Sequence, residues 1–148
     1  MKKALIILLI FNLFGCNNEK KDYLSDVDKV ELINKTINSI KFYDNLSEIY
    51  RDSTPTIVTN KSITKKILSK VNYNNSIVYL SDKDSTDLSK WKSDWLHPKF
   101  YISFEDIKLN ENKVYIVIRV RSTGVLGKLI FEFKEKKWVL INQTYGKT

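Results

Sequence analysis

Four successive segments in the last third of the chain alternate apolar and polar side chains. The alternation covers residues 100–105, 114–121, 128–134 and 138–143. A period of two is that of a β-strand, because successive side chains point to opposite faces of a sheet. Turn-forming residues separate the segments at Asn110-Glu111-Asn112, Thr123-Gly124 and Glu135-Lys136. Because such short connections join antiparallel neighbours, the pattern predicts a four-stranded antiparallel meander with one apolar face.

The segments before the meander show helical periodicity. Residues 24–40 place Val30, Ile33 and Ile37 on one face, and Ser25 with Asp28 has the spacing of a capping box. Further helices are predicted within residues 44–51, 60–71 and 86–97, and short strands at 56–59 and 76–80. A sheet with one apolar face needs cover. The predicted fold is therefore α+β, with N-terminal helices packed on a C-terminal four-stranded antiparallel meander.

Three tryptophans are predicted at the contact between the helices and the meander. Trp91 and Trp95 share one face of the helix that ends before Pro98. In the last strand Trp138, Leu140 and Asn142 share one face, and Val139, Ile141 and Gln143 share the other. This arrangement indicates that the helix packs on the sheet. The alternative is that the three indoles line an apolar pocket.

The N-terminus has the layout of an export signal. Lys2 and Lys3 precede an apolar run over residues 4–14, and Gly15 is the small residue expected at a cleavage site. A membrane-spanning helix needs roughly 20 apolar residues. Here the apolar run is shorter, and the polar residues 17–22 follow directly. The sequence therefore favours an export signal over a membrane span.

The stretch Leu13-Phe14-Gly15-Cys16 resembles the lipobox of bacterial lipoproteins. The resemblance implies that the Cys16 thiol carries a diacylglyceryl group, that the chain is cleaved before Cys16, and that the new amine is acylated. One acyl chain binds a bilayer weakly, whereas two or three together form a stable anchor. The chain then divides into a signal peptide (1–15), a lipidated cysteine with a polar tether (16–23), and a single α+β domain (24–148).

The charge of the chain favours a membrane over nucleic acid. The formal net charge is +8, and lysine supplies 22 of the 25 basic residues. Nucleic-acid surfaces favour arginine for its planar, bidentate fork. Lysines near anionic headgroups each add roughly 1 kcal/mol of attraction. The predicted partners are a membrane, through the lipid on Cys16, and a protein or small molecule of unknown identity.

No catalytic or metal-binding constellation is complete in the sequence. His97 is the single histidine and could act as a base beside a serine and an aspartate, but no nucleophile-elbow pattern accompanies it. The alternative is a histidine that meets the last carbonyls of a helix. Asp82, Asp84 and Asp87 lack the glycine and the distant glutamate of a calcium loop. We therefore predict no catalytic residue, no metal and no cofactor.

The polar face of the meander is the candidate ligand or partner surface. Its members are Tyr115, Arg119, Arg121, Glu105 and Glu132. Arginines on such a face can clamp a carboxylate or another planar anion. The alternative is a cross-strand charge ladder, in which the two arginines face the two glutamates on neighbouring strands.

The order of the predicted elements resembles the nuclear transport factor two-like cone fold, over residues 24–143 and by topology alone. That resemblance implies a pocket behind the sheet, and such folds serve as enzymes or ligand-binding modules. Residues 131–142 also resemble the closing hairpin of small exported bacterial domains.

We predict a lipid-anchored lipoprotein of the cell envelope with a non-catalytic binding domain. Because Asn17 follows the cysteine in place of aspartate, the outer membrane is favoured if the cell has one. The alternatives are a cone-fold enzyme or small-ligand module, and an inhibitor or immunity-type lipoprotein.

Overall fold

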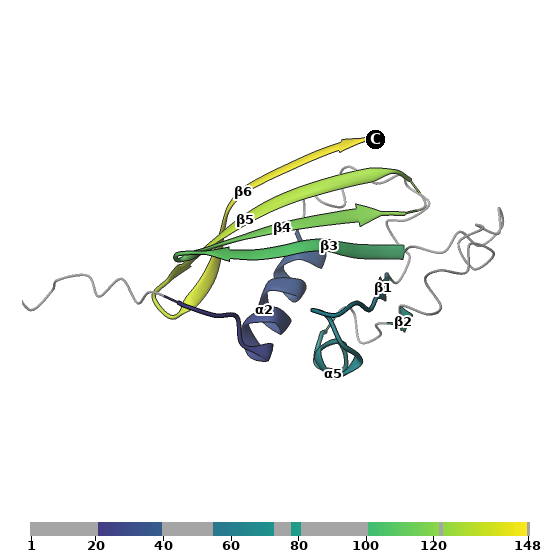
Figure 1. Ribbon diagram of the computed structural model, residues 1–148. Helices are drawn as coiled ribbons and strands as arrows, with labels where there is room; N and C mark the ends of the chain where they lie inside the picture. Colours follow the sequence, from purple (N-terminus) through teal and green to yellow (C-terminus); the bar gives the residue numbers. More distant parts are fainter. Residues whose placement is uncertain (1–20, 40–54, 73–77, 81–100, 122, 148) are drawn as a thin grey trace, which may run out of the picture.

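In a computed structural model, five parts of the chain are described: residues 21–39, 55–72, 78–80, 101–121 and 123–147 (Figure 1). Their elements, in chain order, are α2 (Asp26–Ile37), β1 (Thr56–Val58), α5 (Lys65–Leu68), β2 (Val78–Leu80), β3 (Tyr101–Asn110), β4 (Lys113–Val120), β5 (Val125–Lys134) and β6 (Lys137–Lys147). None of the described helices is long and apolar enough to cross a bilayer.

All six described strands form one mixed sheet in the order β2-β1-β3-β4-β5-β6. The strand β1 runs parallel to both of its neighbours, whereas β3 to β6 pair antiparallel in sequence order. The predicted α+β class is confirmed. The predicted sheet of four antiparallel strands is wrong in its extent, because the short strands β1 and β2 extend the sheet beyond β3. A strand of three residues is too short for its periodicity to reveal which strand it pairs with.

The helix α2 begins where its capping box predicts. The Ser25 hydroxyl accepts the backbone N–H of Asp28, and the Asp28 carboxylate accepts the backbone N–H of Ser25. Reciprocal bonds of this kind satisfy donors that an α-helix leaves free at its first turn. One face of α2 buries Leu32, Ile33 and Ile37 completely.

The helix predicted within residues 60–71 is much shorter in the structure. Before it, the Asn60 side chain accepts the backbone N–H groups of Ser62 and Ile63, both at 2.8 Å. This local side-chain turn competes with helical hydrogen bonding, so α5 is a single turn. The helices predicted within residues 44–51 and 86–97, with Trp91 and Trp95, lie outside the described residues.

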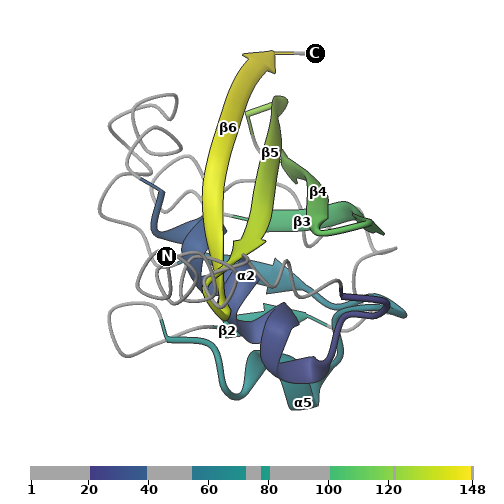
Figure 2. The ribbon, with the colours of Figure 1, turned by 90° about the vertical axis from the view of Figure 1, so that its left-hand side faces the viewer.

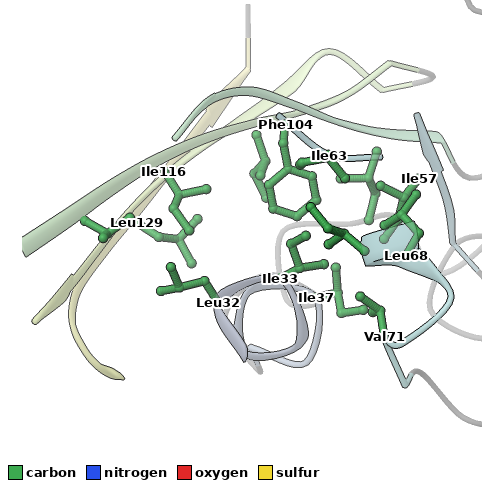
Figure 3. Packing of buried hydrophobic residues seen from close by; sticks show 14 of the residues in the cluster. Leu32, Ile33, Ile37, Ile57, Ile63, Leu68, Val71, Phe104, Ile116 and Leu129 are labelled. Atoms are coloured by element: carbon green, nitrogen blue, oxygen red, sulfur yellow. The ribbon is translucent and has the colours of Figure 1, made fainter. Parts of the chain in front are cut away.

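The core lies between the two described helices and one face of the sheet. Both α2 and α5 lie on the same side of β3 to β6, as two perpendicular views show (Figures 1 and 2). Leu32, Ile33 and Ile37 point from α2 toward the sheet, where Phe104, Ile116 and Leu129 meet them (Figure 3). Ile57 of β1, together with Ile63, Leu68 and Val71 in and around α5, closes one side of this cluster.

A β-bulge in the β5–β6 pair changes which side chains of β6 face the core. The register shifts between Ile130 and Phe131, so that Ile141 has no direct partner on β5. After the shift, Gln143 lies opposite the buried Leu129, and the exposed Asn142 lies opposite Ile130. The prediction that Asn142 shares the apolar face with Trp138 is therefore wrong, because an extra residue reverses the alternation.

Gly127 leaves room for the ring of Tyr145 on the neighbouring strand. A Cβ atom on Gly127 would lie 2.7 Å from Cε1 of Tyr145 and 2.8 Å from Cγ1 of Ile118. Both distances are shorter than carbon–carbon contact allows. A side chain at this buried position would displace the ring, the isoleucine or both.

We expect Gly127→Ala to lower the free energy of unfolding by about 1–3 kcal/mol, the usual effect of inserting an extra carbon into a packed core. Urea denaturation followed by tryptophan fluorescence measures the change. Gly146→Ala is the matched control on the adjacent strand, because its added Cβ meets nothing within 4 Å. Equal stability of the two variants would contradict the predicted packing of Tyr145 on Gly127.

Candidate functional site

Strand β4 carries the predicted surface residues Tyr115 and Arg119 on the face that points away from the core. The alternate side chains Val114, Ile116 and Ile118 are buried, at 1% exposure or less. Tyr115 is 40% exposed. The described helices cover only the opposite face of the sheet (Figures 1 and 2). We call the side away from these helices the outer face.

Arg119 and Glu105 are brought together on the outer face. The distance from Arg119 Nε to Glu105 Oε1 is 2.5 Å, and that from Nη2 to Oε2 is 3.5 Å. Glu105 occupies a register shift in β3, between Phe104 and Asp106, which pair with Ile118 and Val117. The hydrogen bond to Glu105 and its negative charge raise the pKa of Arg119 above its usual value. This is one pair of the predicted cross-strand charge ladder, and an anion would have to displace Glu105 to reach the guanidinium.

Glu132 does not join this pair. It lies opposite Lys113 on β4, and its carboxylate accepts a bond from Lys134 at 2.6 Å. The hydrogen bond from Lys134 lowers the pKa of Glu132, and partial desolvation opposes that shift. The prediction that an arginine faces Glu132 is wrong, because the register of β4 and β5 places a lysine there.

Arg121 lies at the other end of β4. Its backbone N–H donates to the carbonyl of Tyr101 at 3.1 Å, just beyond the last residue of the strand. At roughly 3.4 Å per residue, the ends of β4 are more than about 20 Å apart. The five predicted residues therefore do not form a single cluster. Arg119, paired with Glu105, is the last residue but one of β4 and lies near Arg121. Tyr115 lies toward the other end of β4, where Glu132 is opposite Lys113.

The outer face also carries apolar side chains that the sequence reading did not include in the site. Tyr115 lies opposite Ile130 on β5, and Ile130 lies opposite Asn142 on β6. The neighbouring bulge residue Ile141 is 44% exposed. Tyr115, Val117, Ile130 and Ile141, spread over three strands, are called the outer patch below. A sequence signal for this patch exists. On the predicted polar face of β4 and β5, each position that is not charged carries an apolar or aromatic side chain.

A hollow of about 300 Å³ opens beside the register shift of β3, between that strand and the turn at Asn60. The Asn60 amide donates to the carbonyl of Phe104 at 2.9 Å and so fixes one wall. The two carboxylates that line the hollow are both in ion pairs, Glu105 with Arg119 and Asp106 with Lys108. Among the described residues, no three histidine, cysteine or acidic side chains are close enough to hold a metal. Cys16 and His97 lie outside the described residues.

The buried carboxylate of Asp28 is the most perturbed acid in the described part of the chain. It accepts bonds from the Ser25 hydroxyl at 2.5 Å and from Trp138 Nε1 at 2.9 Å, and a third from Lys21. Burial by itself raises the pKa of Asp28, but these hydrogen bonds outweigh burial and lower the pKa to about 2. A carboxylate so fully bonded is a poor general base, and it holds α2 to β6 instead.

No family model, no curated protein and no solved structure matches this chain. The resemblances to the lipobox and to the cone fold therefore stay predictions.

We expect the stability of the protein to fall as the pH is lowered from about 4 to about 2. The pKa of Asp28 is about 2 in the folded state, against 3.8 for the ordinary carboxyl group. Ionised Asp28 therefore stabilises the fold above pH 4, and protonation removes about 2 kcal/mol of that stability as the pH approaches 2. Thermal unfolding at a series of pH values measures the loss.

The variant Asp28→Asn tests the origin of that loss. It should be less stable at neutral pH and should show a flatter dependence between pH 4 and pH 2. Asp26→Asn is the control, because Asp26 lies in the same helical turn but is exposed. If the stability of Asp26→Asn depended on pH as weakly as that of Asp28→Asn, the pH dependence would belong to groups other than Asp28.

Proposed function

We propose that this protein is a lipoprotein of the cell envelope, anchored through lipid on Cys16, whose domain binds a partner with its outer face. The observation that carries the binding role is the outer patch, where exposed Tyr115 and Ile141 lie on the sheet face that also carries the Arg119–Glu105 pair. An apolar centre with charged neighbours is the usual composition of a protein interface, and tyrosine is enriched there.

The position of Lys21 supports the anchor. Its ammonium bonds the Asp28 carboxylate and lies 4.5 Å from the centre of the Phe133 ring. Lys21 is therefore part of the folded domain, and only residues 17–20 separate it from Cys16. An extended chain reaches at most about 3.6 Å per residue, so the lipidated cysteine is within roughly 18 Å of the domain. A tether of that length suits a domain held at a membrane surface.

The end of the sheet nearest this tether carries lysines. Phe133, which contacts Lys21, is followed by the β5–β6 turn with the exposed residues Lys134, Lys136 and Lys137. Each lysine near anionic headgroups adds about 1 kcal/mol of attraction. In our proposal this turn faces the bilayer, and the strands lead away from it with the outer face accessible from the side.

The described acidic groups favour contact with a partner surface over chemistry on a small molecule, because their carboxylates are already paired or hydrogen-bonded. In the hollow beside β3 both carboxylates are in ion pairs, and Asp28 is fully bonded. An inhibitor or immunity-type role is one form of the proposed binding function, in which the partner is a toxin or a hydrolase.

The anchor predicts that Cys16→Ser abolishes both palmitate labelling and membrane association. Metabolic labelling followed by membrane fractionation measures both properties in one preparation. A variant that still fractionates with membranes and migrates as the processed form would refute the lipid anchor, while leaving the binding face untested by that experiment.

The binding face predicts a position-specific crosslink in intact cells. A photo-crosslinking amino acid at position 115 or 141 should yield a discrete adduct with the partner. The same amino acid at Tyr79 is the matched control, because Tyr79 is similarly exposed, at 37% against 40% for Tyr115, but lies on β2 at the far edge of the sheet. Equal crosslinking from positions 115 and 79 would argue against the outer patch.

A further inference from the structure

A second hollow, of about 280 Å³, opens toward the C-terminal end of β6, at the opposite end of the sheet from the β5–β6 turn (Figure 1). Four of the residues that line it form two neighbouring cross-strand pairs, Leu126 with Gly146 and Lys128 with Thr144. These pairs belong to the outer face, because Lys128 also lies opposite Val117 on β4. The hollow therefore adjoins the outer patch, of which Val117 is a member.

Gly146 leaves the space that forms this hollow. A Cβ atom built on Gly146 would meet nothing within 4 Å, and Gly146 is not one of the glycines with positive φ. A larger side chain at this position would fill the hollow without straining the strand. Pockets for small molecules usually measure roughly 300–1,000 Å³. The Gly146 hollow is smaller than that, and its size suits a single side chain of a partner.

Lys128 supplies the charge of the Gly146 hollow on the outer face. The described acidic side chains of this face are already paired with cations: Glu105 with Arg119, Asp106 with Lys108, and Glu132 with Lys134. Lys128 is exposed, and no described carboxylate lies within ion-pair distance of its ammonium. The positive charge of Lys128 is therefore available to a partner.

The surroundings of Lys128 are mostly apolar. Val117 lies opposite it on β4, and Leu126 and Ile130 lie two residues away on the same face of β5. A contact that covers these side chains would also remove water from the ammonium, and an unpaired charge is costly to desolvate. A carboxylate on the partner would offset that cost and form a charge-assisted hydrogen bond.

The position of Lys128 favours a protein over a lipid surface. Lys128 lies six residues before Lys134, the last residue of β5, so the two are roughly 20 Å apart along the strand. The attraction of anionic headgroups falls off within a Debye length, about 8 Å at physiological salt. With the β5–β6 turn at the bilayer, as proposed above, Lys128 is beyond the reach of the headgroups.

We propose that the outer face binds a protein surface on which an aspartate or glutamate lies among apolar side chains. Its carboxylate enters the Gly146 hollow and pairs with Lys128, and its apolar neighbours pack on the outer patch. The inference rests on the proposed binding role of this face. The choice of a protein over a lipid surface rests also on the proposed orientation at the membrane.

The test uses the full chain in intact cells, with the photo-crosslinking amino acid at position 115 and the adduct quantified by immunoblot. Lys128→Glu should lower the adduct yield at least tenfold, because two carboxylates would then meet, whereas Lys128→Arg should keep the yield. Gly146→Val should lower it at least threefold by filling the hollow. Thermal unfolding of each purified variant should match that of the unchanged chain.

A matched control separates the local contact from general charge attraction. Lys70→Glu makes the same change in charge at an exposed lysine outside the sheet, and it should leave the adduct yield unchanged. Mass spectrometry of the adduct should identify a partner peptide with an aspartate or glutamate near the crosslink. Replacing that acidic residue with lysine should restore the yield in the Lys128→Glu background.

Four results would overturn the proposal: an unchanged yield in Lys128→Glu, an equal loss in Lys70→Glu, no restoration by the lysine-bearing partner, or an adduct with the mass of a phospholipid. Any of these with a persistent protein adduct at position 115 would remove this inference alone. Absence of any adduct from the otherwise unchanged chain would remove the binding role as well.

Discussion

The contact between Trp138 and the first turns of α2 joins the N-terminal and C-terminal parts of the described fold. The indole is fully buried, lies 5.1 Å from the Phe133 ring, and donates to Asp28. The same carboxylate caps α2 through Ser25 and holds Lys21 where the chain enters the domain. Removing any partner would leave a buried polar group unsatisfied, which costs more than the bond itself contributes. One aspartate thus couples the start of a helix to the last strand.

Much of the fold could be predicted because its signals are local. The strands of the meander are eight or more residues long, and their sequences alternate over six to eight residues, so their periodicity is clear. The capping box of α2 depends on two residues three positions apart, and both perform the predicted role. The turn between β5 and β6 is also local, since Glu135 and Lys136 both have positive φ, which matches a tight hairpin turn.

The features that could not be predicted depend on residues distant in sequence or on a single extra residue. The pairing of β1 with β3 rests on three residues that carry no mark of their partner. The bulges at Glu105 and Ile141 each add one residue, and the second reverses the faces of Asn142 and Gln143. The same limits apply to the candidate site: its face on β4 was predictable from alternation, but the separation of Glu132 from the arginines depends on strand register.

The bulge at Ile141 links the features on which binding is proposed. A bulge bends its strand, increases the local twist and re-aims the side chains beside it. Here it places Ile141 on the outer face, at 44% exposure, near Ile130, which lies opposite Tyr115. The bulge follows, along β6, the residue Trp138, whose backbone N–H and C=O are bonded by Glu31 and Lys35 of α2. A regular β6 would turn Asn142 and Tyr145 to different faces from those they occupy, and Tyr145 would no longer lie on Gly127. One inserted residue therefore keeps the inner face packed while it exposes an isoleucine on the outer face.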